Sequence, residues 1–175
     1  PENYNECVLV LSSNGGMSDF LLYTLGLRDY DELDKWVKDF SNDKNVTVPE
    51  NLGEYSYDDI IGKTFKLVDN SDCYEYDSNY NLWRDKTDNT EYMKKVVKNG
   101  EDLKIVGVVQ PKEDASSMML SMGICYPQSL TTHVMDNAKN SEIVKQQLEN
   151  PDINVFTGKS FDDEGNDNAF DMNSL

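Results

Sequence analysis

The sequence predicts an α+β fold, in which helices pack against a mixed or antiparallel sheet. Residues 7–11 (CVLVL) form an unbroken apolar run between turn residues, which is typical of a buried strand. Residues 103–109 (LKIVGVV) carry β-branched side chains on both faces, which predicts a central strand. Residues 29–40 show the i, i+3, i+4, i+7 spacing of apolar side chains that indicates an amphipathic helix.

Two helices are expected after the first strand. The shorter one begins after Ser18, a favourable N-cap residue, and ends at Gly26. The longer one, at residues 29–40, has four apolar side chains on one face: Leu33, Trp36, Val37 and Phe40. We expect it to pack on the sheet through Trp36 and Phe40, because an isolated helix of this length would be marginal in water.

A half-exposed strand is predicted at residues 63–68, where Phe65 and Leu67 alternate with polar side chains. We expect it to pair with residues 103–109 as an antiparallel neighbour. Pro111 should end the second of these strands, since proline has no N–H for a sheet hydrogen bond. Residues 69–102 then form an insertion between two paired strands.

The insertion contains a hairpin and a helix. Two short aromatic runs flank the turn residues 77–79, which predicts paired strands. A helix follows at residues 91–99, with Gly100 as its stop and three side chains pointing inward: Tyr92, Val96 and Val97.

The C-terminal third is expected to be mainly helical. Pro127 opens a helix whose buried side carries Leu130, Val134 and Ala138. A second helix at residues 142–149, capped by Asn140 or Ser141, turns three side chains inward: Ile143, Val144 and Leu148. A short strand is predicted at residues 153–156.

The predicted domain covers residues 1–159. Residues 160–175 contain five acidic residues, no basic residue and little apolar content, which predicts a disordered acidic linker or a truncated continuation. The chain begins Pro1-Glu2-Asn3, so we interpret it as an excised piece of a longer protein.

The charge excludes several classes of partner. In 175 residues, 33 acidic residues face 16 basic ones, for a net charge of −17. Nucleic acids need clustered Lys and Arg, and so does docking on an anionic membrane surface, so the charge argues against both as partners. The longest apolar runs are far shorter than the roughly 20 residues that span a bilayer. The three cysteines, Cys7, Cys73 and Cys125, allow one disulfide but form no framework.

Two sequence patterns resemble parts of catalytic sites, but neither contains all the features that such a site requires. Gly62 and Lys63 match the end of a phosphate-binding loop, but Tyr57 stands where that motif requires a glycine. We therefore interpret Gly62 as a turn residue before a strand. His133 is the single histidine, and with Asp136 and Cys125 it could form a Cys–His–Asp hydrolase site, although no family signature surrounds the cysteine.

No metal or other cofactor is predicted. The cysteines lack the short spacing of zinc ligands, and the acidic clusters at residues 69–72, 85–88 and 162–167 do not match a calcium loop. Asp58 and Asp59 precede two isoleucines, and we interpret them as a helix start rather than as paired catalytic acids.

Three methionines, Met118, Met119 and Met122, are the candidate partner contacts. Their flexible thioether side chains adapt to varied apolar surfaces. The alternative is that Met119 and Leu120 fill the core under a loop, and copper(I) binding is a more remote option.

Residues 57–68 (YDDIIGKTFKLV) and 103–109 resemble the glycine-led strand pair in the large extracytoplasmic domain of FtsX/MacB-type ABC transporter permeases. Other segments resemble permeases of Gram-positive bacteria more closely: residues 8–11 (VLVL), 18–19 (SD), 22–27 (LYTLGL) and 141–158 (SEIVKQQLENPDINVFTG). The resemblance covers roughly residues 7–160. In MacB-type permeases a tight hairpin joins the two strands, whereas here residues 69–102 intervene.

The resemblance implies a MacB-like domain on the extracytoplasmic face of the cell membrane, between the first two membrane helices of a permease. Its partners would be the rest of the permease, an ATP-binding subunit and an exported peptide, lipoprotein or other protein. It implies no catalytic residue here, because ATP is hydrolysed in a separate nucleotide-binding domain. The competing interpretations are a freestanding secreted binding module and a structural cell-surface domain.

Overall fold

The computed structural model describes residues 1–42, 44, 53–112, 114–115, 117 and 119–164. Its contacts divide the chain into two compact units. The first comprises Pro1–Phe65 and Asp102–Leu130, and the second comprises Lys66–Glu101 and Thr131–Leu175. None of the helices in the described part of the chain has the length and apolar character needed to cross a membrane.

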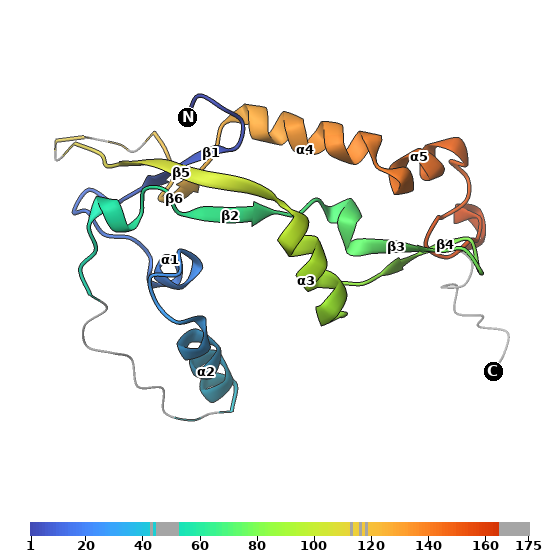
Figure 1. The fold of residues 1–175 in the computed structure, drawn as a ribbon, viewed down its shortest axis with the longest axis horizontal. Helices are drawn as coiled ribbons and strands as arrows, with labels where there is room; N and C mark the ends of the chain where they lie inside the picture. Colours follow the sequence, from blue (N-terminus) through green and yellow to red (C-terminus); the bar gives the residue numbers. More distant parts are fainter. Residues whose placement is uncertain (43, 45–52, 113, 116, 118, 165–175) are drawn as a thin grey trace, which may run out of the picture. The chain divides into compact units, whose positions relative to one another are not determined.

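A four-stranded mixed sheet has the order β2-β5-β1-β6 (Figure 1). Strand β1 (Glu6–Val10) runs parallel to β5 (Glu101–Val109) and antiparallel to β6 (Gly123–Cys125). Strand β2 (Thr64–Leu67) neighbours β5 and runs in the opposite direction. The α+β class, the central position of β5 and its pairing with β2 are therefore confirmed.

The turn before β2 accounts for the partial phosphate-loop pattern. Gly62 has a φ of +93°, a conformation that side-chain-bearing residues rarely adopt, and its N–H donates to the Ile105 carbonyl over 2.8 Å. Just upstream, the short 3-10 helix η1 (Tyr57–Asp59) begins with a capping box between Ser56 and Asp59. Both segments thus have the structural roles predicted for them.

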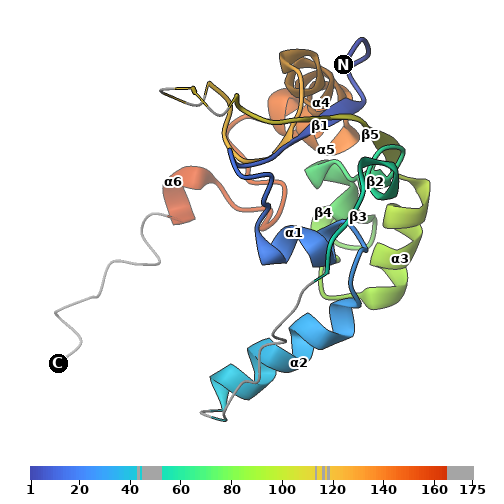
Figure 2. The same ribbon diagram turned by 90° about the vertical axis from the view of Figure 1, so that its left-hand side faces the viewer.

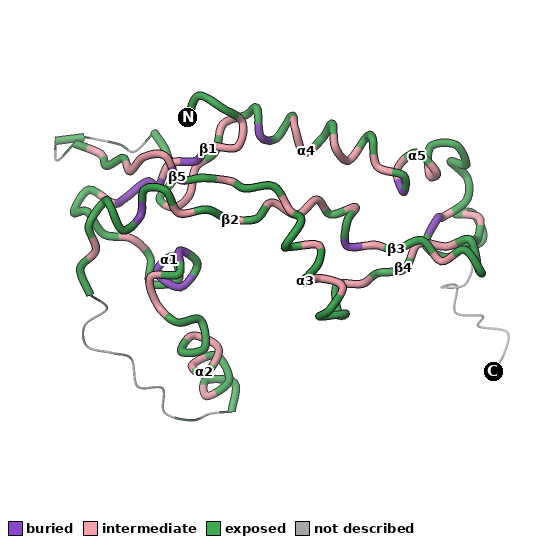
Figure 3. The backbone as a smooth tube through the Cα atoms, in the orientation of Figure 1, coloured by how far each residue is buried: buried purple, intermediate pink, exposed green. Residues whose placement is uncertain are grey.

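The core of the first unit lies between the sheet and helix α1 (Asp19–Thr24). Five buried side chains form its centre: Leu9, Leu11, Leu25, Ile60 and Ile105. Figure 3 shows the buried positions concentrated on β1 and α1. The apolar run at residues 7–11 was therefore a correct prediction of a buried strand.

Helix α2 (Tyr30–Ser41) forms where its apolar stripe predicted, with Asp29 as N-cap. Its predicted packing on the sheet is wrong. Helix α1 lies between the sheet and α2 (Figures 1 and 2), and Trp36 of α2 contacts Tyr23 of α1 instead. Phe40 is 79% exposed. The short α1, with its own buried side chains, occupies the surface that α2 was expected to cover.

The predicted insertion separates β2 from β5 in the chain. It holds the 3-10 helix η2 (Asn70–Cys73), the antiparallel strands β3 (Tyr74–Asp77) and β4 (Leu82–Asp85), and helix α3 (Thr90–Asn99). The hairpin and the helix are confirmed, with Asn89 as the N-cap of α3. The inward orientation of Val97 is wrong, because its side chain is 44% exposed.

Helices α4 (Gln128–Asn140) and α5 (Glu142–Glu149) match their predicted positions, and Ser141 is the N-cap of α5. On α5, Ile143 is buried as expected. Leu148 is 67% exposed, so its predicted inward position is wrong.

The strand predicted at residues 153–156 is also wrong, since only Ile153 forms a bridge, with Ser160. The Gln147 side chain donates to the Ile153 carbonyl and accepts from the Val155 N–H, which holds this segment as a loop. Residues 160–164 depart from the predicted disorder, because Ser160 accepts from the N–H groups that begin α6 (Phe161–Glu164). Residues 165–175 lie outside the described part of the chain.

Candidate partner-binding site

The candidate site lies in the first unit, where the parallel strands β1 and β5 end together. Val10 is paired with Val109, and the Leu11 N–H donates to the Val109 carbonyl over 2.9 Å. Pro111 follows and cannot donate to a further sheet hydrogen bond. The Gln110 side chain donates to the Ser13 carbonyl over 2.8 Å, which ties the two strand ends together.

A cavity of about 230 Å³ opens at these strand ends. The described residues that line it are mostly apolar, and none of them has an ionisable side chain: Val10, Val109, Gln110, Pro111, Ala115, Ser117, Met119 and Leu120. A lining of this kind offers burial of apolar surface together with a few hydrogen-bonding groups. It therefore suits a binding contact rather than proton transfer or metal ligation.

One of the predicted contact residues, Met119, lies at this cavity, and a second, Met122, follows Leu120 by two positions in the chain. Met119 lines it and is 98% exposed, and Met122 is 59% exposed. Leu120, between them, is 49% exposed. Met118 lies outside the described residues. The alternative that Met119 fills the core is wrong, because almost its whole side chain faces solvent. That these methionines contact a partner stays a prediction.

The residues of the rival hydrolase site have other neighbours. His133 Nε2 lies 2.9 Å from Glu101 Oε1 and 3.2 Å from Asn137 Nδ2, and neither group is a thiol. Cys125 Sγ donates to the Ser121 carbonyl over 3.5 Å. Sequence reasoning missed the pairing of His133 with Glu101, because the two residues lie far apart in the chain and share no motif.

The cysteines and acids form no metal centre in the described part of the chain, where no group of three or more His, Cys, Asp and Glu side chains could hold an ion. All three cysteines are free. Burial raises the pKa of the Cys7 thiol, and the nearby Cys125 adds to this shift. A thiol with a raised pKa is a poor nucleophile at neutral pH.

A second cavity, of about 290 Å³, lies within the second unit and was not predicted. It is lined chiefly by apolar side chains from β3, α5 and the loop after α5. The apolar periodicity of residues 143–148 was its only sequence signal, and it was interpreted as core packing. The residues around this cavity carry the further inference below.

Comparisons of the chain with protein-family models, with curated proteins and with solved structures gave no match. The resemblance to FtsX/MacB-type permeases therefore depends on the quoted sequence segments alone.

Proposed function

We propose that this chain is a non-catalytic binding module that contacts an apolar part of a peptide or protein partner through Met119, Leu120 and Met122. The observation that carries the proposal is the 98% exposure of Met119 at the mouth of an apolar cavity. Exposing a large apolar side chain next to a concave apolar surface favours association, because contact removes both surfaces from water. Methionine suits partners of varied shape.

The proposed setting is the extracytoplasmic domain of an ABC transporter permease. There the module would contact an exported substrate or a protein partner and would move with the permease as ATP is hydrolysed elsewhere. This setting is supported by the sequence segments that resemble FtsX/MacB-type permeases. In this setting ATP is bound by another domain. That is compatible with Gly62 and Lys63, which form part of a turn before the edge strand β2 and not a complete phosphate-binding motif.

The alternative is a freestanding secreted or cell-surface binding module. The two settings differ in the sequence that encodes the residues on either side of this chain. A permease requires an apolar stretch of about 20 residues before Pro1 and further such stretches after Leu175, with a nucleotide-binding domain in the same chain or an adjacent gene. A precursor with only a cleavable signal peptide would contradict the permease setting while leaving the binding module intact.

The contact itself is tested by photo-cross-linking in cells that make the full-length protein. A benzophenone amino acid in place of Met119 should cross-link to a specific partner, because the group would lie in the interface. The same amino acid in place of Met135, which is 65% exposed on α4, is the matched control. Equal cross-linking from both positions, or none from position 119, would contradict the proposed contact.

A further inference from the structure

The second unit contains two adjoining cavities that share the side chains Ser71, Tyr74 and Ile143. The first is the apolar cavity of about 290 Å³, and the second measures about 260 Å³. Each lies at or below the roughly 300 Å³ at which small-molecule pockets begin. Two small pockets with a common wall are suited to two neighbouring side chains of one ligand.

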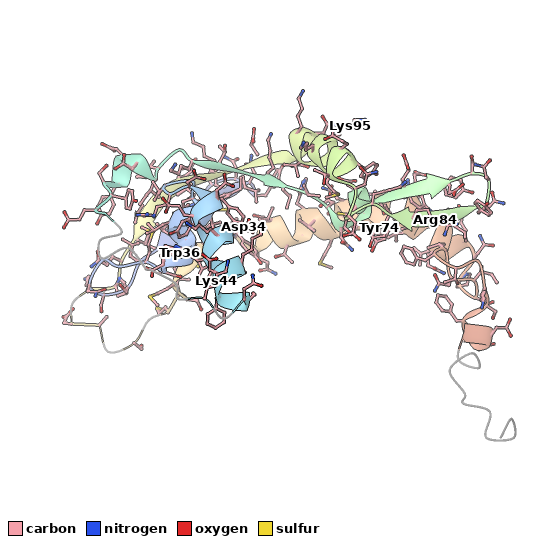
Figure 4. The ribbon with its side chains drawn as sticks, turned by 90° about the horizontal axis from the view of Figure 1, so that it is seen from below. Asp34, Trp36, Lys44, Tyr74, Arg84 and Lys95 are labelled. Carbon is pink, nitrogen blue, oxygen red and sulfur yellow. The ribbon has the colours of Figure 1, made fainter. Side chains whose placement is uncertain are left out.

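The first pocket is apolar. Val144 and Leu148 of α5 line it together with Phe156 of the following loop, and Tyr74 contacts Phe156 with ring centroids 5.1 Å apart. Figure 4 labels Tyr74 at the start of β3. Leu148 and Phe156 are 67% and 42% exposed, so an apolar side chain placed here would cover surface that is now in contact with water.

The second pocket combines aromatic rings with carboxylates. Tyr74, Trp83 and Tyr92 line it together with Asp72 and Glu142. The polar edges of two rings are already used: Tyr92 Oη donates to the Tyr74 carbonyl over 3.0 Å, and Trp83 Nε1 donates to Gln146 Oε1 over 2.7 Å. These two polar groups are therefore satisfied within the protein, and what the rings offer a ligand is aromatic surface, whose faces attract cations.

The charges around this pocket leave an excess of negative charge. Glu142 is paired with Lys145, and Lys86, the other nearby cation, is paired with Glu75. Glu142 also offsets the positive N-terminal end of α5. Burial and the nearby Asp69 raise the pKa of Asp72. Asp69 in turn has one buried oxygen, Oδ1, without a hydrogen-bond partner among the described residues.

We propose that these joined pockets bind a peptide segment in which a basic residue stands next to an apolar residue, with the backbone turned so that both side chains point to the same side. The basic side chain would lie among Tyr74, Trp83 and Tyr92 beside Asp72, and the apolar side chain would lie between Leu148 and Phe156. The net charge of −17 would draw such a segment to the protein. This site uses other residues than the methionine site and does not depend on the proposed function.

The test is calorimetric titration of the whole chain with two blocked peptides, acetyl-Gly-Leu-Arg-Gly-amide and its reversed order acetyl-Gly-Arg-Leu-Gly-amide. Each is compared with a version that carries citrulline, the uncharged analogue of arginine, and with a version that carries alanine in place of leucine. We expect at least one arginine peptide to bind, with affinity that falls as salt is added. Its citrulline and alanine versions should each bind about threefold to tenfold more weakly.

Matched variants locate the binding. Asp72→Asn and Leu148→Ser should weaken binding of the arginine peptide several-fold. Asp88→Asn makes the same change, and Val97→Ser a similar one, on exposed residues outside both pockets, and neither should weaken binding. Should Asp72→Asn fail to fold by circular dichroism, Glu142→Gln serves in its place. No binding of either arginine peptide, equal affinity for the citrulline peptide, or equal effects of the pocket and control variants would each overturn the proposal.

Discussion

Tyr23 and Trp36 meet edge to face, with ring centroids 5.7 Å apart and planes inclined by 78°. This geometry is favourable for aromatic pairs. Tyr23 is buried on α1, and Trp36 is the half-buried residue of α2 labelled in Figure 4. The contact joins α2, which has no fully buried residue, to α1 in the first unit.

Replacing Trp36 with alanine should therefore lower the free energy of unfolding by about 1.5–3 kcal/mol, less than the roughly 3–5 kcal/mol expected for a fully buried tryptophan. Phe40→Ala, on the same helix, should change it by less than about 0.5 kcal/mol because Phe40 is already in water. Urea unfolding followed by circular dichroism measures both. Similar losses for the two variants would contradict the observed packing of α2.

Gly100 allows the chain to pass close to β2. A Cβ atom at this position would lie 2.4 Å from the Leu67 carbonyl oxygen, which is backbone and cannot rotate away. Gly100→Ala should therefore destabilise the protein by about 1–3 kcal/mol. Gly107→Ala is the control, because its Cβ would meet Val8 at an ordinary 3.8 Å. Equal midpoints of thermal unfolding for the two variants would show that this close approach is not present in solution.

Glu6 has a strongly lowered pKa. The side chain of Asn3, followed by the N–H groups of Glu2 and Asn3, donates to its carboxylate and lowers its pKa from 4.5 to about 2. Because folding favours the ionised form, the stabilisation is present above pH 4.5 and is lost as the pH falls toward 2. Asn3→Ala should raise the midpoint of the Glu6 titration observed by NMR. Asn5→Ala, which removes a hydrogen bond to Asp102, should leave it unchanged.

The three thiols should differ in reactivity. Cys7 and Cys73 are buried and Cys125 is partly exposed, and the pKa of Cys7 is raised. Since the thiolate is the reactive form, iodoacetamide should label Cys125 first under native conditions. Peptide mass spectrometry would show this, with urea-unfolded protein as the control in which all three react. Fast labelling of Cys7 in the folded protein would contradict its burial.

The sequence predicted those elements whose signal is local. The run at residues 7–11, the stripe of α2, the aromatic runs around residues 77–79 and the caps of α3 and α5 all depend on neighbours within a few residues. Each of these elements was identified correctly. The pairing of β2 with β5 across 33 intervening residues was also predicted correctly.

The wrong predictions of buried side chains share a physical cause. Amphipathic periodicity identifies the apolar face of a helix, but it does not identify which other element packs against that face. Phe40, Val97 and Leu148 all lie on apolar faces that the neighbouring elements cover only in part. The loop at residues 153–156 is held by the side chain of Gln147, a contact that no strand pattern contains. The pockets around Tyr74 and Trp83 likewise depend on residues that lie far apart in the sequence.

The central claim is that the methionines at residues 118–122, of which Met119 and Met122 are exposed, form a partner contact. The most direct test changes Met118, Met119 and Met122 to serine in one variant of the full-length protein. Two quantities are measured: the function of the protein in cells, and the melting temperature of this domain. Met135→Ser, an exposed methionine on α4, is the control. We predict that the triple variant loses function while its melting temperature stays within a few degrees of the parent. Full function, or a large loss of stability, would contradict the claim.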